Sequence, residues 1–327
     1  MRVVVTGAAG WIGQKVGVCL AARGCSVIGA DILEQSVFEA RFDDKKSCWD
    51  EYHRVEITCP IDNYISGVDA VVHCAGYAHR PNETAYERKK FYAVNREGTK
   101  HVLDWSERFS VKRFLYVSSI AFYDWESPED LVVGEEHPVK LSSHYAKSKY
   151  EGEVLVRESL LDWRVVRLAT VFGDGDRANF SRMARIMKKR MFPIPGKGEA
   201  RKSVIPVDLA AELIADFILL DNPPHRLINV GLPSAPSLDE ITEAYRKICG
   251  FPKCLKLPMP VARAMGAGGS LAAKILGKFP FTLDTLRKLT TDTVVSVDRM
   301  LECFPEREFE DFDEYLGRCA SYYSDVV

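Results

Sequence analysis

The segment that decides the fold of this chain reads Val3-Val4-Val5-Thr6-Gly7-Ala8-Ala9-Gly10-Trp11-Ile12-Gly13. The run of valines is typical of a buried strand, and the glycines after it predict a sharp turn into a helix that begins at Trp11-Ile12. Glycines at such a turn let a diphosphate approach the helix N-terminus, where free N–H groups and the helix dipole favour anions. A purely structural glycine turn is the alternative interpretation, because glycines alone are not specific for a ligand.

A second predicted strand favours the ligand interpretation. Its pattern covers Ser26–Asp31, so that Asp31 stands at the strand's carboxyl end. An acid at this position can accept both ribose hydroxyls of a dinucleotide and would repel a 2′-phosphate. The residues that follow, Ile32-Leu33-Glu34-Gln35, include no arginine to hold such a phosphate. The sequence therefore predicts NAD, rather than NADP, as the cofactor.

Strand and helix patterns continue to alternate through the first 170 residues. Continuous apolar strands alternating with helices predict an α/β fold with a doubly wound parallel sheet, a Rossmann arrangement with right-handed crossovers. The strands are expected at Arg2–Thr6, Ser26–Asp31, Arg54–Ile57, Ala70–His73, Phe114–Ser118 and Arg164–Leu168, and two further helices over about Ala85–Phe109 and Tyr145–Leu160.

The composition of the sequence changes after Gly173. Proline and glycine become denser, as in Phe192–Gly196, and strand patterns become sparse. We expect an NAD-binding domain over residues 1–172 and a smaller, interleaved substrate-binding domain over residues 173–327. Some later segments, such as Leu227–Gly231, are expected to return to the sheet.

Composition argues against several classes of function. The formal net charge is −2 at pH 7, which provides no global basic field, so neither a nucleic-acid nor a membrane partner is expected. The nine cysteines include no CxxC pair and no zinc-like Cys/His spacing, so no metal site is expected, and a reducing, cytoplasmic location is predicted. Ile205–Leu220 has acids along one helical face, and Ala262–Gly277 is short and broken by glycines, so neither predicts a membrane span.

A tyrosine and a lysine lie one helical turn apart in Tyr145-Ala146-Lys147-Ser148-Lys149. At positions i and i+4 the phenol and the ammonium share one face of a helix. A tyrosine titrates at about pH 10 when unperturbed, and a nearby ammonium or oxidised nicotinamide would lower that pKa. Tyr145 can then exchange a proton with a substrate hydroxyl or carbonyl. Taken alone, the pattern is also common on solvated helix faces.

Two serines end a predicted strand upstream of Tyr145. Ser118 and Ser119 follow Phe114-Leu115-Tyr116-Val117. A serine at this point can hydrogen-bond the oxygen that reacts, although serines also simply terminate strands.

These motifs together resemble the extended branch of the short-chain dehydrogenase/reductase superfamily, which includes nucleotide-sugar epimerases and dehydratases. The resemblance covers nearly the whole chain and is weakest after about residue 235. It rests on the Thr-Gly-x-x-Gly-x-x-Gly turn, on an acidic-aliphatic pair after the third strand, on His73-Cys74-Ala75-Gly76, and on an Asn-x-x-Gly-Thr helix motif. It implies that NAD is bound by Gly7, Gly10, Trp11, Ile12, Gly13, Asp31, Glu56, Ile57, Cys74, Ala75, Gly76, Asn95, Ser118, Tyr145 and Lys149.

The resemblance also implies the catalytic set. Ser118-Ser119-Ile120-Ala121-Phe122-Tyr123 is similar to the family's Ser-Ser-x-x-x-Tyr, which selects Ser119 as the catalytic serine beside Tyr145 and Lys149 and places Ser118 nearer the cofactor. Sugar 4,6-dehydratases of the family carry an Asp-Glu pair directly after that serine. Here the two positions are Ile120 and Ala121, neither of which can transfer a proton, so dehydration is not expected.

Two further segments resemble the family's substrate-binding elements. Arg201 matches an arginine that grips the diphosphate of nucleotide sugars, a task for which the planar guanidinium is suited. Asn179, at an expected helix start, matches a residue that also contacts the nucleotide, and Phe192–Gly196 resembles the strand under the base. A surface salt bridge is the alternative interpretation of Arg201.

The resulting hypothesis is an NAD-dependent nucleotide-sugar epimerase that inverts C4 of a UDP-hexose or UDP-N-acetylhexosamine through a transient 4-keto sugar. Two alternatives remain open. One is an NAD(P)-dependent dehydrogenase or reductase of a keto-sugar nucleotide or a sterol-like alcohol, and the other is a non-catalytic NAD-binding sensor. The predicted helices around Ala85–Phe109 and Tyr145–Leu160 also permit a homodimer, although their apolar stripe of Val94, Val102, Trp105 and Phe109 is equally suited to packing on the sheet.

Overall fold

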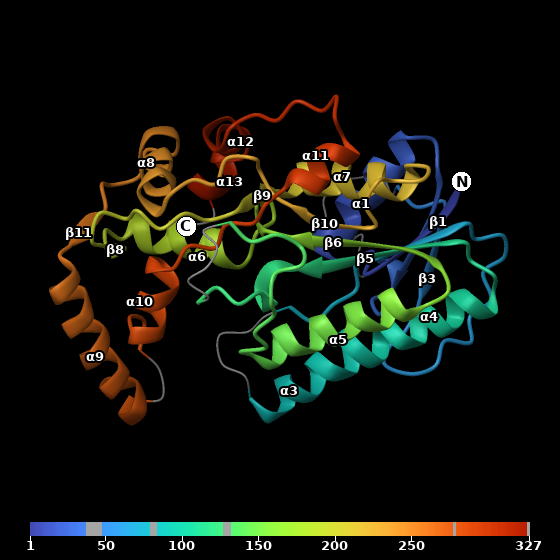
Figure 1. The fold of residues 1–327 in the computed structure, drawn as a ribbon, viewed down its shortest axis with the longest axis horizontal. Coiled ribbons are helices and arrows are strands. Elements are labelled where there is room, and N and C mark those ends of the chain that lie inside the picture. The colour runs from blue at the N-terminus through green and yellow to red at the C-terminus, as the bar shows by residue number, and fades with distance from the viewer. Residues whose placement is uncertain (37–47, 79–83, 127–131, 277–278, 326–327) are drawn as a thin grey trace.

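The computed structural model describes residues 1–36, 48–78, 84–126, 132–276 and 279–325. Its centre is a parallel sheet of seven strands in the order β10-β6-β5-β4-β1-β2-β3 (Figure 1). The chain order reverses between β1 and β4, which makes that junction the topological switch point of the sheet. The strands are β1 (Arg2–Thr6), β2 (Ser26–Asp31), β3 (Glu51–Arg54), β4 (Ala70–His73), β5 (Arg113–Ser119), β6 (Asp162–Leu168) and β10 (Leu227–Val230).

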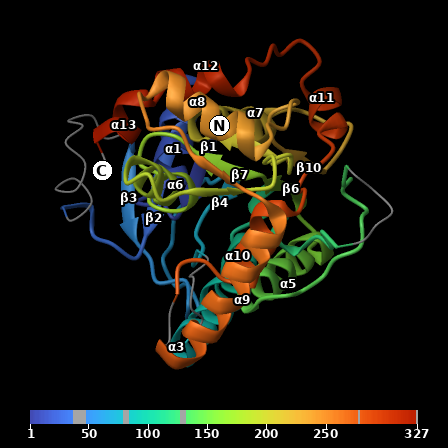
Figure 2. The same ribbon diagram turned by 90° about the vertical axis from the view of Figure 1, so that its left-hand side faces the viewer.

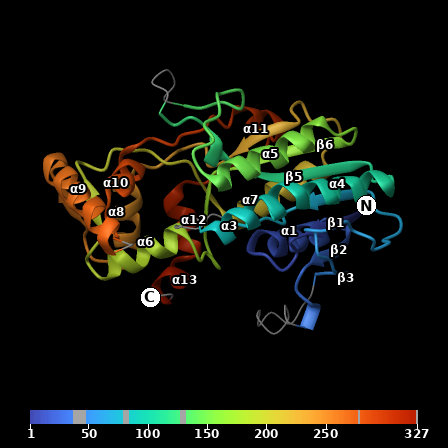
Figure 3. The same ribbon diagram turned by 90° about the horizontal axis from the view of Figure 1, so that it is seen from below.

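Helices cover both faces of this sheet, so the predicted doubly wound α/β fold is confirmed (Figure 3). One face is covered by α1 (Trp11–Ala22) and α7 (Val207–Leu219), which pack against each other. The acidic side of α7 faces outward, where Asp208 pairs with Lys15 and Asp216 with Arg23 on α1. The opposite face is covered by α3 (Ala85–Phe91), a π-helical turn η1 (Tyr92–Gly98), α4 (Thr99–Arg108) and α5 (His144–Glu158).

The prediction of a strand at Arg54–Ile57 is wrong, because the observed strand begins and ends three residues earlier. The structure places β3 at Glu51–Arg54, where Asp31 and Arg54 form the last pair with β2. Val55 and Ile57 then leave the sheet and are buried in the core instead. Their apolar, β-branched side chains thus reflect burial rather than pairing, and these two causes give the same local sequence pattern.

The apolar stripe of the second predicted helix packs on the sheet. Val102 and Trp105 on α4 are buried in the core under β4 and β5, with Val94 and Phe109 packed against the same cluster. This burial explains the stripe without a second subunit. The helix is continuous from α3 to α4, but η1 widens its middle turns around the buried Asn95. Such π-helical turns are rare and are frequent at functional sites.

The remaining elements extend from the carboxyl end of the sheet. Two small sheets, β8 with β11 and β7 with β9, connect them. In the described ranges no helix is long and apolar enough to cross a membrane. The elements are η2 (Ile120–Phe122), β7 (Thr170–Phe172), α6 (Asn179–Lys188), β8 (Pro193–Pro195), β9 (Val204–Pro206), α8 (Leu238–Ile248), β11 (Leu255–Leu257), α9 (Met259–Leu276), α10 (Leu283–Thr290), α11 (Asp298–Cys303), α12 (Phe312–Arg318) and α13 (Ala320–Asp325).

Candidate active site

The glycine turn after β1 has no room for side chains. Gly7 has φ +70°, and a Cβ on it would lie 2.7 Å from Ala75 Cα. A Cβ on Gly10 or Gly13 would collide with the Gly7 carbonyl oxygen. In the described chain neither a capping side chain nor an acid occupies the first turn of α1. The N-terminus of α1 therefore presents a bare backbone cradle that suits a diphosphate.

Two neighbours of this turn are fixed by the surrounding loops. The Trp11 indole donates from Nε1 to the Asp174 carbonyl at 2.5 Å and lies against Gly175, where an added Cβ would be 2.8 Å from the ring. Ile12 is half-buried against the core. The turn is thus braced from the segment that follows β7.

Asp31, at the carboxyl end of β2, has its carboxylate fixed beside the glycine turn. Its Oδ2 accepts the Ala9 N–H at 3.0 Å and its Oδ1 accepts the Leu33 N–H at 3.0 Å. These bonds hold an acid next to the loop where a dinucleotide's adenosine ribose would lie in this fold. The placement fits the expected selection against a 2′-phosphate.

We expect Asp31→Asn to raise the affinity for NADP about 10-fold or more, because the change removes the negative charge that repels the 2′-phosphate and keeps the side-chain shape. Fluorescence titration of the protein with NAD and NADP measures the change. Asp62→Asn, at an acid whose side chain is 92% exposed, is the control and should leave the ratio of the two affinities unchanged. An unaltered ratio in Asp31→Asn would contradict the assigned role.

A buried histidine that the sequence analysis did not select anchors the loop after β4. His73 Nδ1 lies 2.6 Å from the Thr6 hydroxyl and Nε2 lies 3.0 Å from the Thr99 hydroxyl. Burial, and then the positive charge of Lys149, lowers the pKa of His73 to about 3, so the ring is neutral. The Thr99 hydroxyl donates to the Asn95 carbonyl, which makes Nε2 the donor to Thr99 and Nδ1 the acceptor from Thr6.

Asn95 fixes the next residues of the same loop. Its Oδ1 accepts the Tyr77 N–H at 2.7 Å, and its Nδ2 donates to the Tyr77 carbonyl and to Ser148 Oγ on α5. Gly76 lies between, since an added Cβ would be 3.4 Å from Asn95 Oδ1 and 3.8 Å from Lys149 Nζ. The structure thus brings Gly76, Asn95 and Lys149 together.

The other residues predicted to bind the cofactor lie around the glycine turn and the loop after β4. Ala75 abuts Gly7, and burial raises the pKa of the Cys74 thiol to about 12, so this cysteine is an uncharged lining residue. Ile57 packs under Gly98. The Glu56 carboxylate is exposed and accepts the backbone N–H and the hydroxyl of Thr58. In this structure the Glu56 carboxylate therefore stabilises the turn formed by residues 56–58.

Ser119 and Tyr145 meet where β5 and α5 approach each other. The Ser119 side chain neighbours the Tyr145 phenol and influences its pKa, and Ser119 Oγ accepts the Ala121 N–H at 3.2 Å. Ser143 caps α5 by accepting the Ala146 N–H, which fixes the turn that carries Tyr145. Phe91 packs against the Tyr145 ring, with 5.8 Å between the two ring centres. A paired serine and tyrosine can orient a substrate oxygen and exchange its proton.

The environment of Tyr145 differs from the sequence-based expectation that Lys149 lowers its pKa. Burial raises the pKa of Tyr145 above its usual value, and the neighbouring Ser119 side chain lowers it in part. Lys149 shares the helix face but donates from Nζ to the Val117 carbonyl at 2.7 Å, and lies 4.2 Å from the centre of the Tyr116 ring. Without a bound dinucleotide the phenol therefore keeps its proton at neutral pH.

Burial lowers the pKa of Lys149 from 10.5 to about 8, against the opposing negative charge of Glu153. The folded chain thus binds fewer protons at Lys149 than the unfolded chain does between about pH 8 and 10.5. Stability contributed by this group therefore rises with pH through that window. At pH 7 the charged amine is a cost to the fold.

We accordingly expect Lys149→Met to be more stable to denaturant than the native protein at pH 7, by about 3 kcal/mol in the free energy of unfolding, while turnover is lost. The advantage should shrink between pH 8 and 10.5, as chemical denaturation of both proteins across that range will measure. Lys147→Met, at a neighbour whose side chain is 49% exposed, is the control. An advantage that stays constant with pH would refute the depressed pKa.

Ser118 points to a buried ion pair that the sequence analysis missed. Its hydroxyl donates to Glu153 Oε2 at 2.7 Å, and Arg167 Nη2 lies 2.6 Å from Glu153 Oε1. The side chains of Glu153 and Arg167 are 0% and 2% exposed. Glu153 follows Lys149 by one helical turn, so the shared helix face was the available signal. In this structure the Ser118 hydroxyl is bonded to Glu153, and its expected place nearer the cofactor stays a prediction.

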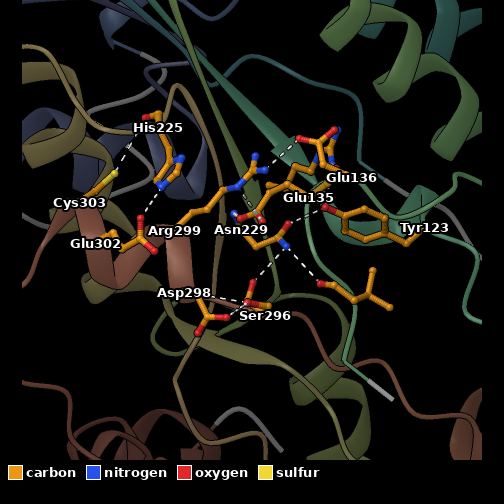
Figure 4. Close-up of polar contacts among 12 residues, drawn as sticks. Tyr123, Glu135, Glu136, His225, Asn229, Ser296, Asp298, Arg299, Glu302 and Cys303 are labelled. Carbon is orange, nitrogen blue, oxygen red and sulfur yellow. Dashed lines mark hydrogen bonds and ion pairs between the residues drawn. The ribbon is translucent and has the colours of Figure 1, made fainter. Parts of the chain in front are cut away.

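The same network reaches the C-terminal half of the chain. Arg167 Nη1 donates to the Tyr123 hydroxyl, which donates in turn to Asn229 Oδ1 on β10, both at 2.7 Å. Figure 4 shows Asn229 between Tyr123 and the Glu135 side chain, with Arg299 of α11 beyond it; Glu135 Oε1 accepts the Asn229 N–H. The strand end that carries Ser119 is therefore tied to segments far away in sequence.

The predicted substrate residues lie on other elements and are both exposed. Arg201 precedes β9, and its Nε donates to the Ala235 carbonyl at 2.9 Å, which orients the guanidinium. Asn179 is the first residue of α6. Asp176 rather than Asn179 satisfies the start of α6, since its carboxylate accepts the N–H groups of Ala178 and Ser181 at 2.7 Å. The Asn179 amide is not used as that cap.

Side chains that commonly bind metals are scattered over the described part of the chain. The described residues contain no group of three or more His, Cys, Asp and Glu side chains that could hold a metal ion. All nine cysteines are free thiols.

Comparison with known proteins gives one family. The model of the NAD dependent epimerase/dehydratase family matches residues 3–231. The chain is 30% identical over 271 residues to a UDP-glucuronate 4-epimerase of Thermodesulfobacterium geofontis, covering 76% of this chain and 80% of that protein. It is 26% identical over 227 residues to the N-acetyl-alpha-D-glucosaminyl-diphospho-ditrans,octacis-undecaprenol 4-epimerase of Escherichia coli O157:H7. That match covers 67% of this chain and 66%, just under two thirds, of the E. coli protein.

The fold has close counterparts among solved structures. A UDP-glucuronic acid 4-epimerase from Bacillus cereus, crystallised with UDP-glucuronic acid and NAD, superposes with a TM-score of 0.75 over 100% of both chains. The sequence identity is 18%, so the likeness establishes the shared fold and nothing finer.

Proposed function

Because the chain belongs to the NAD dependent epimerase/dehydratase family, we propose that it is a nucleotide-sugar 4-epimerase acting on a UDP-hexose or UDP-N-acetylhexosamine. The observation that carries the proposal is that Ser119, at the carboxyl end of β5, neighbours the Tyr145 phenol, with both side chains half-buried and Lys149 on the same helix face as Tyr145. A pair of this kind serves a reaction that removes and returns the proton of one hydroxyl. The bare glycine turn and Asp31 fit an NAD at the adjoining edge of the sheet.

When bound, NAD supplies a hydride acceptor and a positive charge. In the proposed cycle Tyr145 removes the proton of the 4-hydroxyl as C4 is oxidised to a ketone, and Ser119 holds the oxygen by a hydrogen bond. After the sugar has turned over in the site, Tyr145 returns the proton as C4 is reduced on its other face. Burial keeps the Tyr145 phenol protonated when no other charge is close. Tyr145 can therefore act as a base only when a cation lies near it and lowers its pKa. Arg201 and Asn179 would hold the nucleotide diphosphate.

Two observations argue against a dehydratase and against a non-catalytic sensor, respectively. Ile120 and Ala121 follow Ser119 and provide no acid or base for eliminating water. The proton-transfer pair also argues against a non-catalytic sensor, which has no use for it. A dehydrogenase or reductase would use the same residues but would release the oxidised or reduced product.

The test is incubation of the full chain with a panel of candidate substrates that includes the sugar classes on which the relatives act. The panel consists of UDP-hexoses, UDP-hexuronates, UDP-N-acetylhexosamines and a polyprenyl-diphosphate-linked N-acetylhexosamine. We expect a C4-inverted product from one UDP-hexose or UDP-N-acetylhexosamine, without net formation of NADH. Steady consumption of added NAD or NADH would favour the dehydrogenase or reductase instead. The absence of any C4-inverted product would reject the epimerase.

A cytoplasmic location, a homodimer and the division into domains at residues 172 and 173 belong to the same proposal. Nine free thiols favour a reducing compartment. A homodimer would have to use the outer surfaces of α4 and α5, because the stripe of Val102 and Trp105 is already buried. Sedimentation of the full chain over a range of concentrations measures the subunit number.

A further inference from the structure

Helix α9 packs in an unusual orientation. Its inner face consists of small residues, and it lies close against the segment that leads into α10. Ala262 is fully buried, a Cβ on Gly269 would collide with the Phe281 carbonyl, and one on Gly266 would lie 3.2 Å from the Leu283 side chain. The Ser270 hydroxyl accepts the Leu283 N–H at 3.0 Å. The small residues therefore mediate the packing of this helix on the protein.

The bulky apolar residues of α9 point the other way. Val261, Met265, Leu271 and Ile275 are 46%, 47%, 62% and 78% exposed. With 100° of rotation per residue they fall within one stripe about 120° wide, which excludes the buried Ala262 and Gly269 but has Met265 at the edge nearer to them. A helix on a globular protein ordinarily turns its bulky apolar side chains inward. A contiguous apolar stripe left outside indicates a surface that something else covers.

The charges around this stripe are positive. Residues 251–290 contain seven basic residues and one acid, Asp284, although the whole chain has a net charge of −2. Helix α9 itself has two basic residues and no acid. Arg263 and Lys274 are exposed, lie about 60–80° around the helix beyond the Leu271 edge of the stripe, and form no ion pair with any residue of the described ranges. An anionic partner would complement this surface.

Helix α9 is also well placed to meet a large flat partner. Together with α10 it stands at the end of the molecule far from the N-terminus (Figures 1 and 3), and it lies in front of the other elements when that end is viewed directly (Figure 2). Its outer side is not covered by another element in these views.

We propose that the outer face of α9 docks on an anionic lipid bilayer, with the helix lying in the plane of the interface. The apolar stripe would enter the boundary between headgroups and acyl chains, while Arg263 and Lys274 would meet lipid phosphates. A second copy of the chain is a poorer occupant, because a two-fold contact would place the same basic residues against each other. The expectation of no membrane partner rested on the net charge, which averages over this local basic segment.

The experiment is co-sedimentation of the full chain with phosphatidylcholine vesicles with and without phosphatidylglycerol. We expect binding to the vesicles that contain phosphatidylglycerol, weakening as salt is added. Arg263→Gln with Lys274→Gln should reduce binding about 25-fold, from about 5-fold for each basic residue near the surface. Leu271→Ser with Ile275→Ser should reduce it about 10-fold or more, because the stripe loses apolar area that would leave water.

Leu160→Ser is the matched control, since Leu160 is 97% exposed but lies outside α9, and its binding should equal that of the native chain. All variants should keep the native thermal midpoint and native turnover on a water-soluble substrate, so a failure of this proposal is distinct from a failure of the proposed activity. Three results would overturn it: no sedimentation with either vesicle, equal sedimentation of the α9 variants, or self-association that the Leu271 and Ile275 changes abolish.

Discussion

Tyr145→Phe is expected to lower kcat for sugar epimerisation by about 10³-fold, within the range that removal of a general acid–base group produces. The variant loses only the hydroxyl that exchanges the proton with the substrate oxygen. The ring still packs on Phe91, and the turn around Gly7 that would hold the diphosphate is untouched. Turnover measured by the C4-inverted product should therefore fall, while the dissociation constant for NAD, measured by fluorescence titration, should change less than about 3-fold.

Tyr150→Phe is the matched control for this change. Tyr150 lies on the same helix, is half-buried, and packs on Phe122 at 5.2 Å, away from the Ser119–Tyr145 pair. It should retain nearly native turnover. If Tyr145→Phe kept native turnover, or if it lost NAD binding together with activity, Tyr145 would be a structural residue and the proposed chemistry would be wrong.

Arg167→Met is expected to lower the free energy of unfolding by about 3 kcal/mol, because it leaves the Glu153 carboxylate buried without its main partner. Both side chains are nearly inaccessible, and Arg167 bonds Glu153 through Nε and Nη2. The loss should lie at the lower end of what broken buried ion pairs cost, since Arg157 remains 3.6 Å from Glu153 and Ser118 still donates to it. Urea denaturation with an unchanged slope measures the effect.

The double variant Glu153→Leu/Arg167→Met tests the cause. It removes both charges together and should recover most of the loss, because no uncompensated carboxylate remains. Lys100→Met is the surface control: its partner in the exposed pair is Asp104, one turn away on α4, and stability should change by less than about 1 kcal/mol. If the double variant were as unstable as Arg167→Met, lost packing rather than the unpaired charge would be responsible.

Several features were predictable because they depend on residues close together in sequence. The strand, glycine turn and helix of residues 3–13 follow from local backbone preferences, and so does the position of Asp31 at the end of the next strand. The i and i+4 spacing by itself places Tyr145 and Lys149 on one face of α5. Alternation of strands and helices then determined the parallel sheet, because parallel strands require helical crossovers.

Other features depend on partners that only the folded chain supplies. The Lys149 amine is held by the Val117 carbonyl and the Tyr116 ring, and burial at that point lowers its pKa, which no local pattern reports. The Glu153–Arg167 pair joins α5 to β6, and the buried neutral state of His73 depends on Thr6 and Thr99 from two other elements.

Helix α9 shows the same division most clearly. Its sequence is rich in small residues and interrupted by glycines, and it does not indicate which side of the helix faces the protein. The close approach of the segment before α10, at Phe281 and Leu283, admits only the small residues and leaves Leu271 and Ile275 outside. Sequence determined the small side chains of this segment, whereas steric fit between neighbouring segments of the fold decided which face of the helix is exposed, because the space available at a contact is a property of both partners.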